Sequence, residues 1–433
     1  MGKLPEEKYK GDHHVDPEGN KVSVSKKSRC RKFCCRFFAV TFGLLTTYIS
    51  TILIVYKRVQ KRIAIDTLDL PTQGGSDNYC DSFYVEPSSS VGPYLYDNTF
   101  DISSPIDWSD SGGENALNKF RAIGTHNSYH RQQYPGSPTY WANWWARAIP
   151  DWSYEHPPLT QQFSMGWRTL ELDFHMRKKA SLIYHIQMWD QLTNECTCAA
   201  SCFKLINDWS EANAGHFPLF IMLEPKLLGF LEDSEAMREE ITLEKLLLFE
   251  QLAIQSFGNK IVTPDALRNG KESVLASIQE SGWPSVENFY GKIFFIIWKE
   301  IDNELIQLYI ENTNGLEGRA FFPYQYFGNR YEGGGITPFL HMDRSSENVV
   351  EALEEGFIAR IRMNTVPGLS PDDTGESDGR YEDSVNQGGN IISFDQRYDY
   401  CWELLKNDER CEVFTPAGDK NAKVCKWTYN SDQ

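Results

Sequence analysis

The sequence predicts an α/β protein in which a single transmembrane helix precedes a (β/α)8 barrel of the TIM type. Three observations lead to this prediction. A run of twenty uncharged residues lies near the amino terminus, short apolar segments alternate with helical or looping stretches over residues 117–433, and polar residues follow the ends of several of those segments. The chain has 433 residues, 41% apolar and 13% aromatic, a composition that supports a large core and excludes a wholly disordered chain.

Charge is distributed unevenly along the chain. Residues 1–62 carry 14 lysines and arginines against 5 acidic residues, whereas the remainder carries 29 against 55. Binding to nucleic acid requires a basic surface, so a body this acidic argues against a nucleic-acid partner. The basic amino-terminal segment needs a separate explanation.

The hydrophobic run over residues 37–56, FFAVTFGLLTTYISTILIVY, predicts a transmembrane helix. It contains no charge and no proline, and twenty helical residues rise about 30 Å, the thickness of the bilayer hydrocarbon. A soluble core helix is rarely apolar on every face, and a signal peptide has a shorter basic head. We therefore expect a basic cytoplasmic tail over 1–36, an uncleaved anchor over 37–56, a stalk over 57–116 and the barrel over 117–433.

The flanks of the hydrophobic run predict its orientation. Residues 20–36 hold seven lysines and arginines and residues 57–72 hold four, so the positive-inside bias places the barrel in the lumen or outside the cell. Seven cysteines follow the run, and disulfides persist in such compartments, with one cysteine left free or paired between molecules. The absence of an Asn-x-Ser/Thr sequon points the other way. Three cysteines in the basic flank are either palmitoylation sites or inert thiols: Cys30, Cys34 and Cys35.

Seven apolar segments of the carboxyl-terminal part are expected to be strands, and one long amphipathic segment is expected to be a helix. Strands that alternate with helices pair in parallel, which favours a barrel, and barrel enzymes place their chemistry at the carboxyl ends of the strands. The expected strands are Phe120–Gly124, Arg168–Phe174, Leu182–His185, Leu219–Leu223, Lys292–Trp298, Phe357–Arg362 and Asn390–Phe394, and the expected helix is Ser234–Phe257.

Polar residues end the first three of these strands. His126 and Asn127 follow the first, and His185 ends the third. The second contains Glu171 and Asp173, and a spacing of two residues turns both carboxylates to the same face of a strand. By the rule for barrels, these side chains are expected to meet at one end of the molecule.

Two later strands add further charge. Glu224 and Lys226, separated by one proline, follow the fourth strand. Arg360 and Arg362 repeat the two-residue spacing with positive charge. Each residue alone has a plain structural explanation, such as a hydrogen-bonded histidine, a solvated strand edge or a surface charge. Their joint appearance, in strand order and at strand ends, favours a common site.

The oxygen donors predict a metal site. Asn127, Glu171, Asp173 and Glu224 offer one amide and three carboxylate oxygens, which select Ca²⁺ or Mg²⁺ over zinc. A divalent cation beside two histidines and two arginines is suited to attack on a phosphodiester: the metal acidifies the nucleophile, the histidines move protons and the arginines hold phosphate oxygens.

The segments GTHNSY, LELDFH, LIYH and FIMLEPK resemble the catalytic X region of phosphoinositide-specific phospholipase C, most closely its calcium-dependent microbial branch. HPPLTQQFSMGWRTLELD is similar to that family's lead into its second strand, and GFIARIR and GGNIISFDQ resemble its closing strands; the similarity spans roughly residues 117–400. The resemblance implies that the four oxygen donors bind Ca²⁺, that His126 stabilises the charge on phosphorus and that His185 protonates the leaving diacylglycerol oxygen. One metal-bound carboxylate would be the base for the inositol 2-hydroxyl.

The chain also departs from the pattern. Animal enzymes have two lysines near the segment GKIFFIIWK, where only Lys299 is found. Lys226 is either a phosphate ligand or a surface lysine, and together with Arg360 and Arg362 it is assigned to the substrate phosphate or headgroup. The expected function is a membrane-anchored Ca²⁺-dependent phospholipase C acting on phosphoinositide or glycosylphosphatidylinositol lipids. The alternatives are a glycerophosphodiester phosphodiesterase, a lipase of the sphingomyelinase D type, and a catalytically inactive barrel that acts as a binding protein.

Overall fold

The fold comes from a computed structural model, and the chain divides into two compact units, Met1–Thr72 and Gln73–Gln433. The structure describes residues 48, 50–51, 105–131, 155–177, 180–185, 196, 198–226, 241–300, 303–311, 313–331, 335–342, 348–363, 388–394 and 398–427. In the first unit, Tyr48, Ser50 and Thr51 are helical and exposed. The rest of the expected anchor, the tail and residues 57–104 of the expected stalk lie outside the described residues. Within the described ranges, no helix combines the length and the apolar character needed to cross a bilayer.

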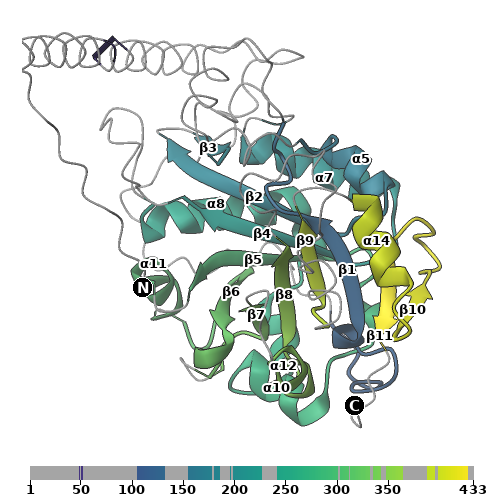
Figure 1. The fold of residues 1–433 in the computed structure, drawn as a ribbon. Coiled ribbons are helices and arrows are strands. Elements are labelled where there is room, and N and C mark those ends of the chain that lie inside the picture. Colours follow the sequence, from purple (N-terminus) through teal and green to yellow (C-terminus); the bar gives the residue numbers. More distant parts are fainter. Residues whose placement is uncertain are drawn as a thin grey trace, which may run out of the picture. The chain divides into compact units, whose positions relative to one another are not determined.

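Among the described residues of the second unit, eight parallel strands close into a barrel (Figure 1). Neighbouring strands pair around the barrel in the order β1, β2, β4, β5, β6, β7, β8, β9, and β9 pairs with β1 again. The barrel strands are β1 (Phe120–Thr125), β2 (Thr169–Arg177), β4 (Leu219–Pro225), β5 (Ile293–Glu300), β6 (Phe321–Tyr326), β7 (Phe339–Met342), β8 (Ile358–Met363) and β9 (Ile391–Phe394). The expected α/β barrel is therefore confirmed.

Three short strands attach to the barrel in antiparallel pairing. β3 (Ala180–Ile183) forms a hairpin with β2, and β11 (Val424–Trp427) pairs with β1 and with β10 (Cys411–Phe414). The carboxyl-terminal hairpin β10–β11 therefore lies against β1, the strand at which the barrel closes.

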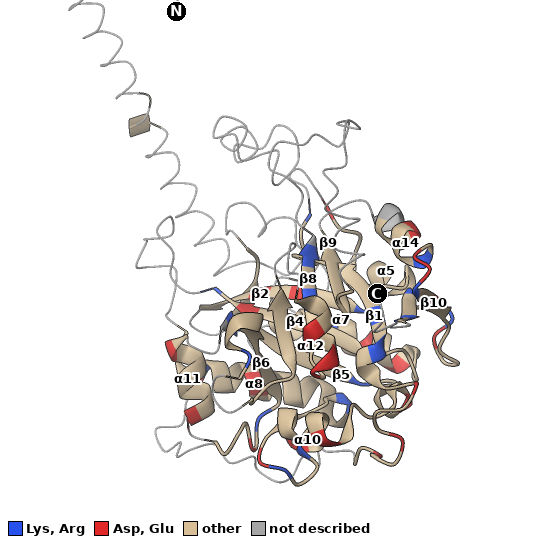
Figure 2. Cartoon of the chain, turned by 60° about the horizontal axis from the view of Figure 1, so that its bottom comes forward, with Lys and Arg blue, Asp and Glu red and all other residues tan. Residues whose placement is uncertain are grey.

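Helices follow the strands and surround the barrel (Figure 1). They are α5 (Leu159–Ser164), α7 (Ala199–Ala212), α8 (Leu243–Phe257), α9 (Pro264–Arg268), α10 (Val274–Ser281), α11 (Glu304–Glu311), α12 (Val349–Glu354) and α14 (Tyr398–Lys406), with 3-10 turns at Leu117–Lys119, Gly258–Lys260, Val286–Phe289 and Phe327–Asn329. Side-chain caps fix some of their starts; the Thr242 hydroxyl, for example, accepts a hydrogen bond from the Lys245 amide (3.4 Å) at the beginning of α8. Outer helices such as α11 and α12 carry acidic residues (Figure 2), in agreement with the acidic body of the chain.

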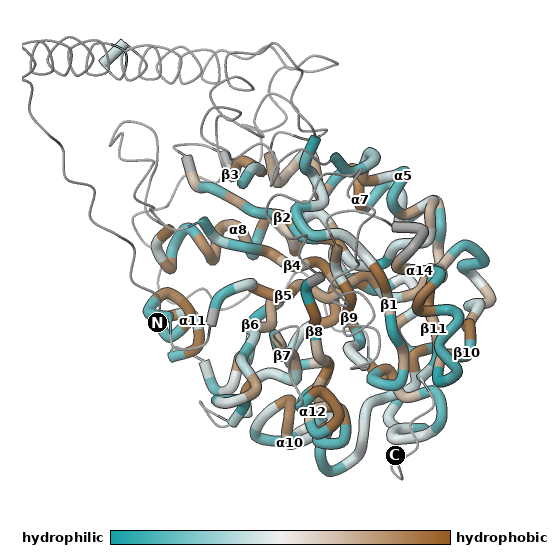
Figure 3. The backbone as a smooth tube through the Cα atoms, in the orientation of Figure 1, coloured by the Kyte–Doolittle hydropathy of each residue, from teal (hydrophilic) through white to brown (hydrophobic). Residues whose placement is uncertain are grey.

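The barrel strands bury both faces, which explains why β4 and β5 are nearly continuous apolar runs in the sequence (Figure 3). Phe220 and Met222 on β4 belong to the cluster that fills the barrel, together with Phe294 and Ile296 on β5. The residues between them pack outward, in a second cluster that includes residues of α7 and α8. Because the alternation is regular, residues that continue the inward-facing series at the carboxyl end of each strand reach the mouth of the barrel.

The expected strands agree with the barrel except in one region. Six of the seven correspond to β1, β2, β4, β5, β8 and β9. The segment expected over Leu182–His185 was wrong as a barrel strand, because β3 ends at Ile183 and pairs antiparallel with β2. Strands β6 and β7 were not predicted: Pro323 interrupts the strand signal of β6, and β7 has only four residues. Of the expected helix Ser234–Phe257, α8 covers Leu243–Phe257, and residues 234–240 lie outside the described part of the chain.

Candidate active site

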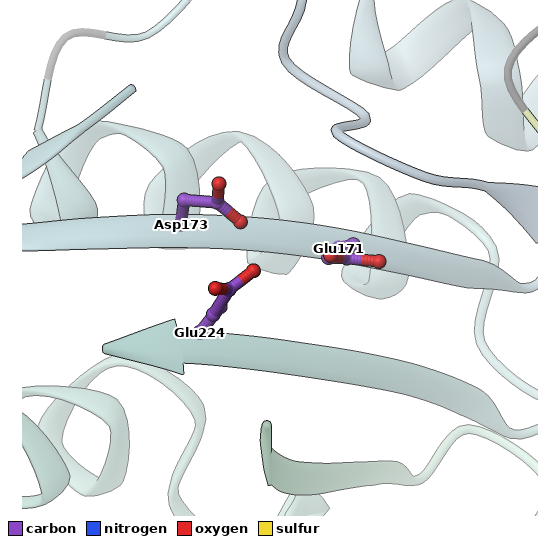
Figure 4. Close-up of side chains that lie close together, drawn as sticks. All are labelled: Glu171, Asp173 and Glu224. Carbon is purple, nitrogen blue, oxygen red and sulfur yellow. The ribbon is translucent and has the colours of Figure 1, made fainter. Parts of the chain in front are cut away.

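Three carboxyl side chains from two neighbouring strands form an acidic cluster at the mouth of the barrel (Figure 4). Glu171 and Asp173 lie on β2, and Glu224 lies on β4 directly opposite Asp173. Glu171 is paired in register with Met222, which faces the barrel interior, so all three carboxylates continue the inward-facing series. Each offers an oxygen within 4.8 Å of the others.

The cluster fits a divalent cation. Within the described part of the chain, Oε1 of Glu171 and Oδ1 of Asp173 are buried and have no hydrogen-bond partner, an arrangement that is costly unless a cation satisfies these oxygens. Oxygens that each lie about 2.3–2.6 Å from one Ca²⁺ are at most about 5 Å apart. The 4.8 Å limit in the cluster therefore suits a single Ca²⁺.

Lys226 lies inside this acidic cluster. Its Nζ is 2.9 Å from Oδ2 of Asp173 and 2.7 Å from Oε1 of Glu224. Burial alone would lower the pKa of Lys226, but the two carboxylates raise it above its ordinary value, so the ammonium stays charged. Burial raises the pKa of Asp173 well above its usual range, whereas Lys226 brings the pKa of Glu224 below its ordinary value despite burial. With all three carboxyls ionised, the cluster keeps a net negative charge even beside Lys226 and Arg360, the partner of Glu171, and this charge attracts a divalent cation.

His126 and Asn127 occupy the turn after β1 and are held against β2. The Ser128 amide donates to the carbonyl of Glu171 (3.0 Å), and the Glu171 amide donates to Oγ of Ser128 (2.7 Å), so the turn lies directly beside the acidic cluster. The Tyr129 hydroxyl donates to Oδ1 of Asn127 (3.1 Å). Nε2 of His126 is 3.7 Å from Oε1 of Glu171, and burial lowers the pKa of His126 well below its usual value, which keeps the ring neutral.

His185 approaches the cluster from the hairpin β2–β3. Its Nε2 is 3.9 Å from Oδ2 of Asp173, and its side chain is 29% exposed. His175, buried on β2, stacks on Tyr184 with ring centroids 3.8 Å apart, and its Nε2–H donates to the Tyr184 carbonyl (2.9 Å). This contact fixes the chain next to His185. His126 and His185 thus lie on either side of the acidic cluster: His126 is buried beside Glu171, and His185 is partly exposed beside Asp173.

The two arginines come from β8, across the mouth. Arg360 is buried; it forms an ion pair with Glu171, donates from Nε to Oγ of Ser393 (3.1 Å) and lies over the Trp298 ring at 3.9 Å. Arg362 is half-buried. Burial is the main cause of the low pKa of His126; the charge of Arg362 lowers that pKa further, whereas Glu171 opposes the shift. Among the described residues, Nη1 of Arg360 and Nε of Arg362 have no hydrogen-bond partner, so both retain a donor inside the mouth.

Further residues lie at the mouth that were not predicted from the sequence. Trp298 and Tyr324 stack with centroids 4.3 Å apart, and His341 lies edge-on to Trp298, also at 4.3 Å. Burial, reinforced by the two arginines of β8, lowers the pKa of His341 to about 3. The signal for His341 was present, since it is a histidine near the end of an apolar segment, FLHM, but that segment was not recognised as a strand.

The sequence matches the family described as phosphoinositide phospholipase C, Ca²⁺-dependent, over residues 116–180 and 174–403, which is more than half of the chain. The search of curated proteins found no significant match.

Several solved structures resemble the fold. A calcium-dependent phosphoinositol-specific phospholipase C from Pseudomonas sp. in its apo form is 17% identical, covering 75% of this chain and 97% of its own, with a TM-score of 0.46. The same bacterium's enzyme in a myoinositol complex is 18% identical, covering 67% and 94%, with a TM-score of 0.45. A Ca²⁺-dependent phosphatidylinositol-specific phospholipase C from Streptomyces antibioticus is 14% identical, covering 67% and 98%, with a TM-score of 0.45.

Proposed function

The chain belongs to the Ca²⁺-dependent phosphoinositide phospholipase C family, and from that premise we propose that it is a membrane-anchored enzyme that cleaves phosphatidylinositol-type lipids into diacylglycerol and cyclic inositol phosphate. The observation that carries the proposal is the acidic cluster of Glu171, Asp173 and Glu224 with a histidine at each side. An inactive binding barrel would not need both histidines beside the metal ligands.

The acidic cluster and Asn127 would hold the Ca²⁺. When bound, the ion supplies positive charge that acidifies the inositol 2-hydroxyl and stabilises the anionic transition state. One of the ligating carboxylates takes the proton of that hydroxyl. Burial of Glu171 and Asp173 excludes water around this transfer, which strengthens each electrostatic interaction.

His126 and His185 differ in burial, and each suits a different role. His126 is buried and neutral, so its ring N–H donates a hydrogen bond to a phosphoryl oxygen on which charge develops. His185 is partly exposed beside the Asp173 carboxylate, which stabilises an imidazolium by Coulomb attraction. His185 therefore gives a proton to the departing diacylglycerol oxygen as the general acid.

The phosphate would be held by the cations of the mouth. Nη1 of Arg360 and Nε of Arg362 keep donors for phosphate oxygens. Lys226 has three ammonium protons, and its contacts with Asp173 and Glu224 leave one for the substrate. The glycosylphosphatidylinositol class carries the same phosphodiester, so it falls within the proposed substrate range.

The test is an assay of purified full-length protein on vesicles that contain phosphatidylinositol. Cyclic inositol phosphate is expected with Ca²⁺, little product with Mg²⁺, and none with excess chelator, while Asp173→Asn lowers Ca²⁺ affinity. Undiminished turnover in chelator would overturn the proposed mechanism. Release of glycerol phosphate from glycerophosphodiesters, with no inositol product, would instead identify the alternative phosphodiesterase.

We also propose that the barrel faces the lumen or the cell exterior. The positive-inside bias of residues 20–36 supports this orientation. Disulfides link Cys196 to Cys202 and Cys411 to Cys425 in the described part of the barrel, and such bonds persist in oxidising compartments.

A further inference from the structure

The turn that carries His126 and Asn127 is held in an unfavourable backbone conformation. Asn127 has a φ of 48°, in the left-handed region that favours glycine and that asparagine adopts more readily than most other residues. Such a conformation costs of order 1 kcal/mol and persists only when surrounding contacts impose it. On one side, the contacts that impose it come from a segment the mechanism does not use, His156 to Gln162, just before and within α5.

Gln162 on α5 is buried and uses all of its hydrogen-bonding groups. Nε2 donates to the carbonyls of Ser128 (2.7 Å) and Pro157 (2.8 Å), and Oε1 accepts from the Thr125 hydroxyl (2.7 Å). Because Nε2 faces two carbonyls, the amide has only one orientation that satisfies them. Gln162 therefore joins the two ends of the turn, residue 125 and residue 128, across the residues that carry the chemistry.

His156, also buried, holds the middle of the same turn. A carbonyl can only accept, so Nε2–H of His156 donates to the His126 carbonyl (2.7 Å). The His156 amide donates to the carbonyl of His130 (2.9 Å), where the turn ends. The turn is thereby fixed from this side at residues 125, 126, 128 and 130, while its other side is hydrogen-bonded to Glu171.

We propose that Gln162 and His156 form a positioning clamp that presets the turn, so that Asn127 can ligate Ca²⁺ and His126 can reach the phosphate. The inference rests on the proposed function for what the site binds. Neither residue touches the reacting atoms; each acts by holding backbone groups of the turn. Residues that orient metal ligands in this indirect way typically change metal affinity about 10–100-fold when they are replaced.

The test compares Gln162→Met with Gln161→Met in full-length protein. Gln161 is the adjacent residue of α5 but is exposed, so it is a matched control. We expect Gln162→Met to weaken Ca²⁺ binding, measured by calorimetry, about 10–100-fold. In the metal-free protein, amide hydrogen exchange over residues 126–130 should accelerate while exchange in β5 stays unchanged. Gln161→Met should match the unsubstituted protein in both measurements.

A purely structural role predicts a different result, namely a lower melting temperature with unchanged Ca²⁺ affinity and unchanged exchange at the turn; that result would overturn the clamp. If Gln162→Met does not fold, Thr125→Val removes one of its contacts with little change of shape and should produce the same two effects on a smaller scale. Neither measurement involves substrate. If Gln162→Met weakens Ca²⁺ binding as expected but the unsubstituted protein cleaves no inositol lipid, the proposed function would be contradicted and the positioning role of Gln162 would still hold.

Discussion

His126 and His185 flank the same two carboxylates but lie in different surroundings, and this difference assigns their roles. Replacing either with alanine removes a proton donor and leaves the oxygen ligands in place. We expect His126→Ala and His185→Ala each to lower turnover about 10²–10⁴-fold, the usual contribution of acid–base groups, with little change in Ca²⁺ affinity. Turnover at saturating Ca²⁺ and calorimetric Ca²⁺ titration measure the two quantities. Near-normal turnover in both variants would show that the roles are wrongly assigned.

Lys226 contributes a positive charge to a site that binds a cation, so its removal should affect binding and turnover in opposite directions. Lys226→Met leaves Asp173 and Glu224 without their shared partner, and we expect Ca²⁺ to bind about tenfold more tightly, or more, because a nearby repulsive charge is gone. Turnover should fall, because a phosphate ligand is lost.

The same two measurements on Lys292→Met provide the control for Lys226. Lys292 precedes β5, at the amino-terminal end of the barrel, and its Nζ donates to the Asn259 carbonyl (2.8 Å). It should show neither effect. Weaker Ca²⁺ binding in Lys226→Met would mean that the ammonium mainly holds the carboxylates in place.

His216, just before β4, should make stability depend on pH. Its Nδ1–H donates to the Phe217 carbonyl (2.7 Å), and in the neutral ring its Nε2 accepts from the Ser210 hydroxyl (2.9 Å). Burial lowers its pKa from the usual 6.5 to about 4. The unfolded chain therefore takes up the proton first, and stability should fall as the pH drops from about 6.5 to about 4, by up to about 3 kcal/mol.

The measurement for His216 is the free energy of unfolding in urea at several pH values between 7 and 4. Other buried histidines, His126 and His341, contribute in the same direction, because burial lowers their pKa values as well. His216→Gln isolates one contribution, since it should show a shallower dependence than the unsubstituted protein. If the free energy of unfolding depends on pH equally in His216→Gln and in the unsubstituted protein, the effect does not come from His216.

At the scale of elements, the sequence revealed the strands that carry the acidic cluster and missed others for physical reasons. β4 is an apolar run that ends in a glutamate, and β2 alternates apolar and polar residues, so the shared face of Glu171 and Asp173 follows from their spacing. That this face turns into the barrel is known only from the pairing of Glu171 with Met222. The pairing of Arg360 with Glu171 joins β8 to β2 across the mouth, and no local pattern encodes such a contact. The same holds for Lys226, whose two partners depend on the register between β2 and β4.

Closure of the barrel depends on a glycine in β1. Gly124 pairs with Thr169 of β2, and a Cβ at Gly124 would lie 2.0 Å from the Thr169 carbonyl oxygen, a backbone atom that cannot move aside cheaply. We expect Gly124→Ala to lower the free energy of unfolding by about 1–3 kcal/mol or more and to displace the turn that begins at His126. Urea unfolding measures the loss.

A matched substitution elsewhere separates this effect from the general one of replacing a glycine. Gly328, in the 3-10 turn after β6, has open space where a Cβ would be. Gly328→Ala should therefore leave stability within about 0.5 kcal/mol of the unsubstituted value. Equal stability of the two variants would mean that the seam between β1 and β2 tolerates a side chain.

At the scale of the whole molecule, the orientation of the chain decides which lipids the enzyme meets. Most phosphoinositide faces the cytosol, so a barrel outside the cell or in a lumen would meet inositol lipids of the outer leaflet or glycosylphosphatidylinositol anchors. Ca²⁺ is abundant on that side, and the disulfides Cys196–Cys202 and Cys411–Cys425 are stable there. The excess of basic residues over 20–36, seven against four over 57–72, supports the same orientation.

Protease added to intact cells tests this orientation. We expect a tag placed at the carboxyl terminus to be digested without permeabilisation, and a tag at the amino terminus to be protected until the membrane is opened. A lumenal location gives the corresponding result in sealed vesicles of known orientation, with the carboxyl-terminal tag protected and the amino-terminal tag exposed. A barrel in the cytosol would be digested in vesicles whose cytosolic side faces outward and would be protected in intact cells. That outcome would move the substrate to the cytosolic leaflet, because an anchored catalytic domain reaches only lipids of the leaflet that it faces.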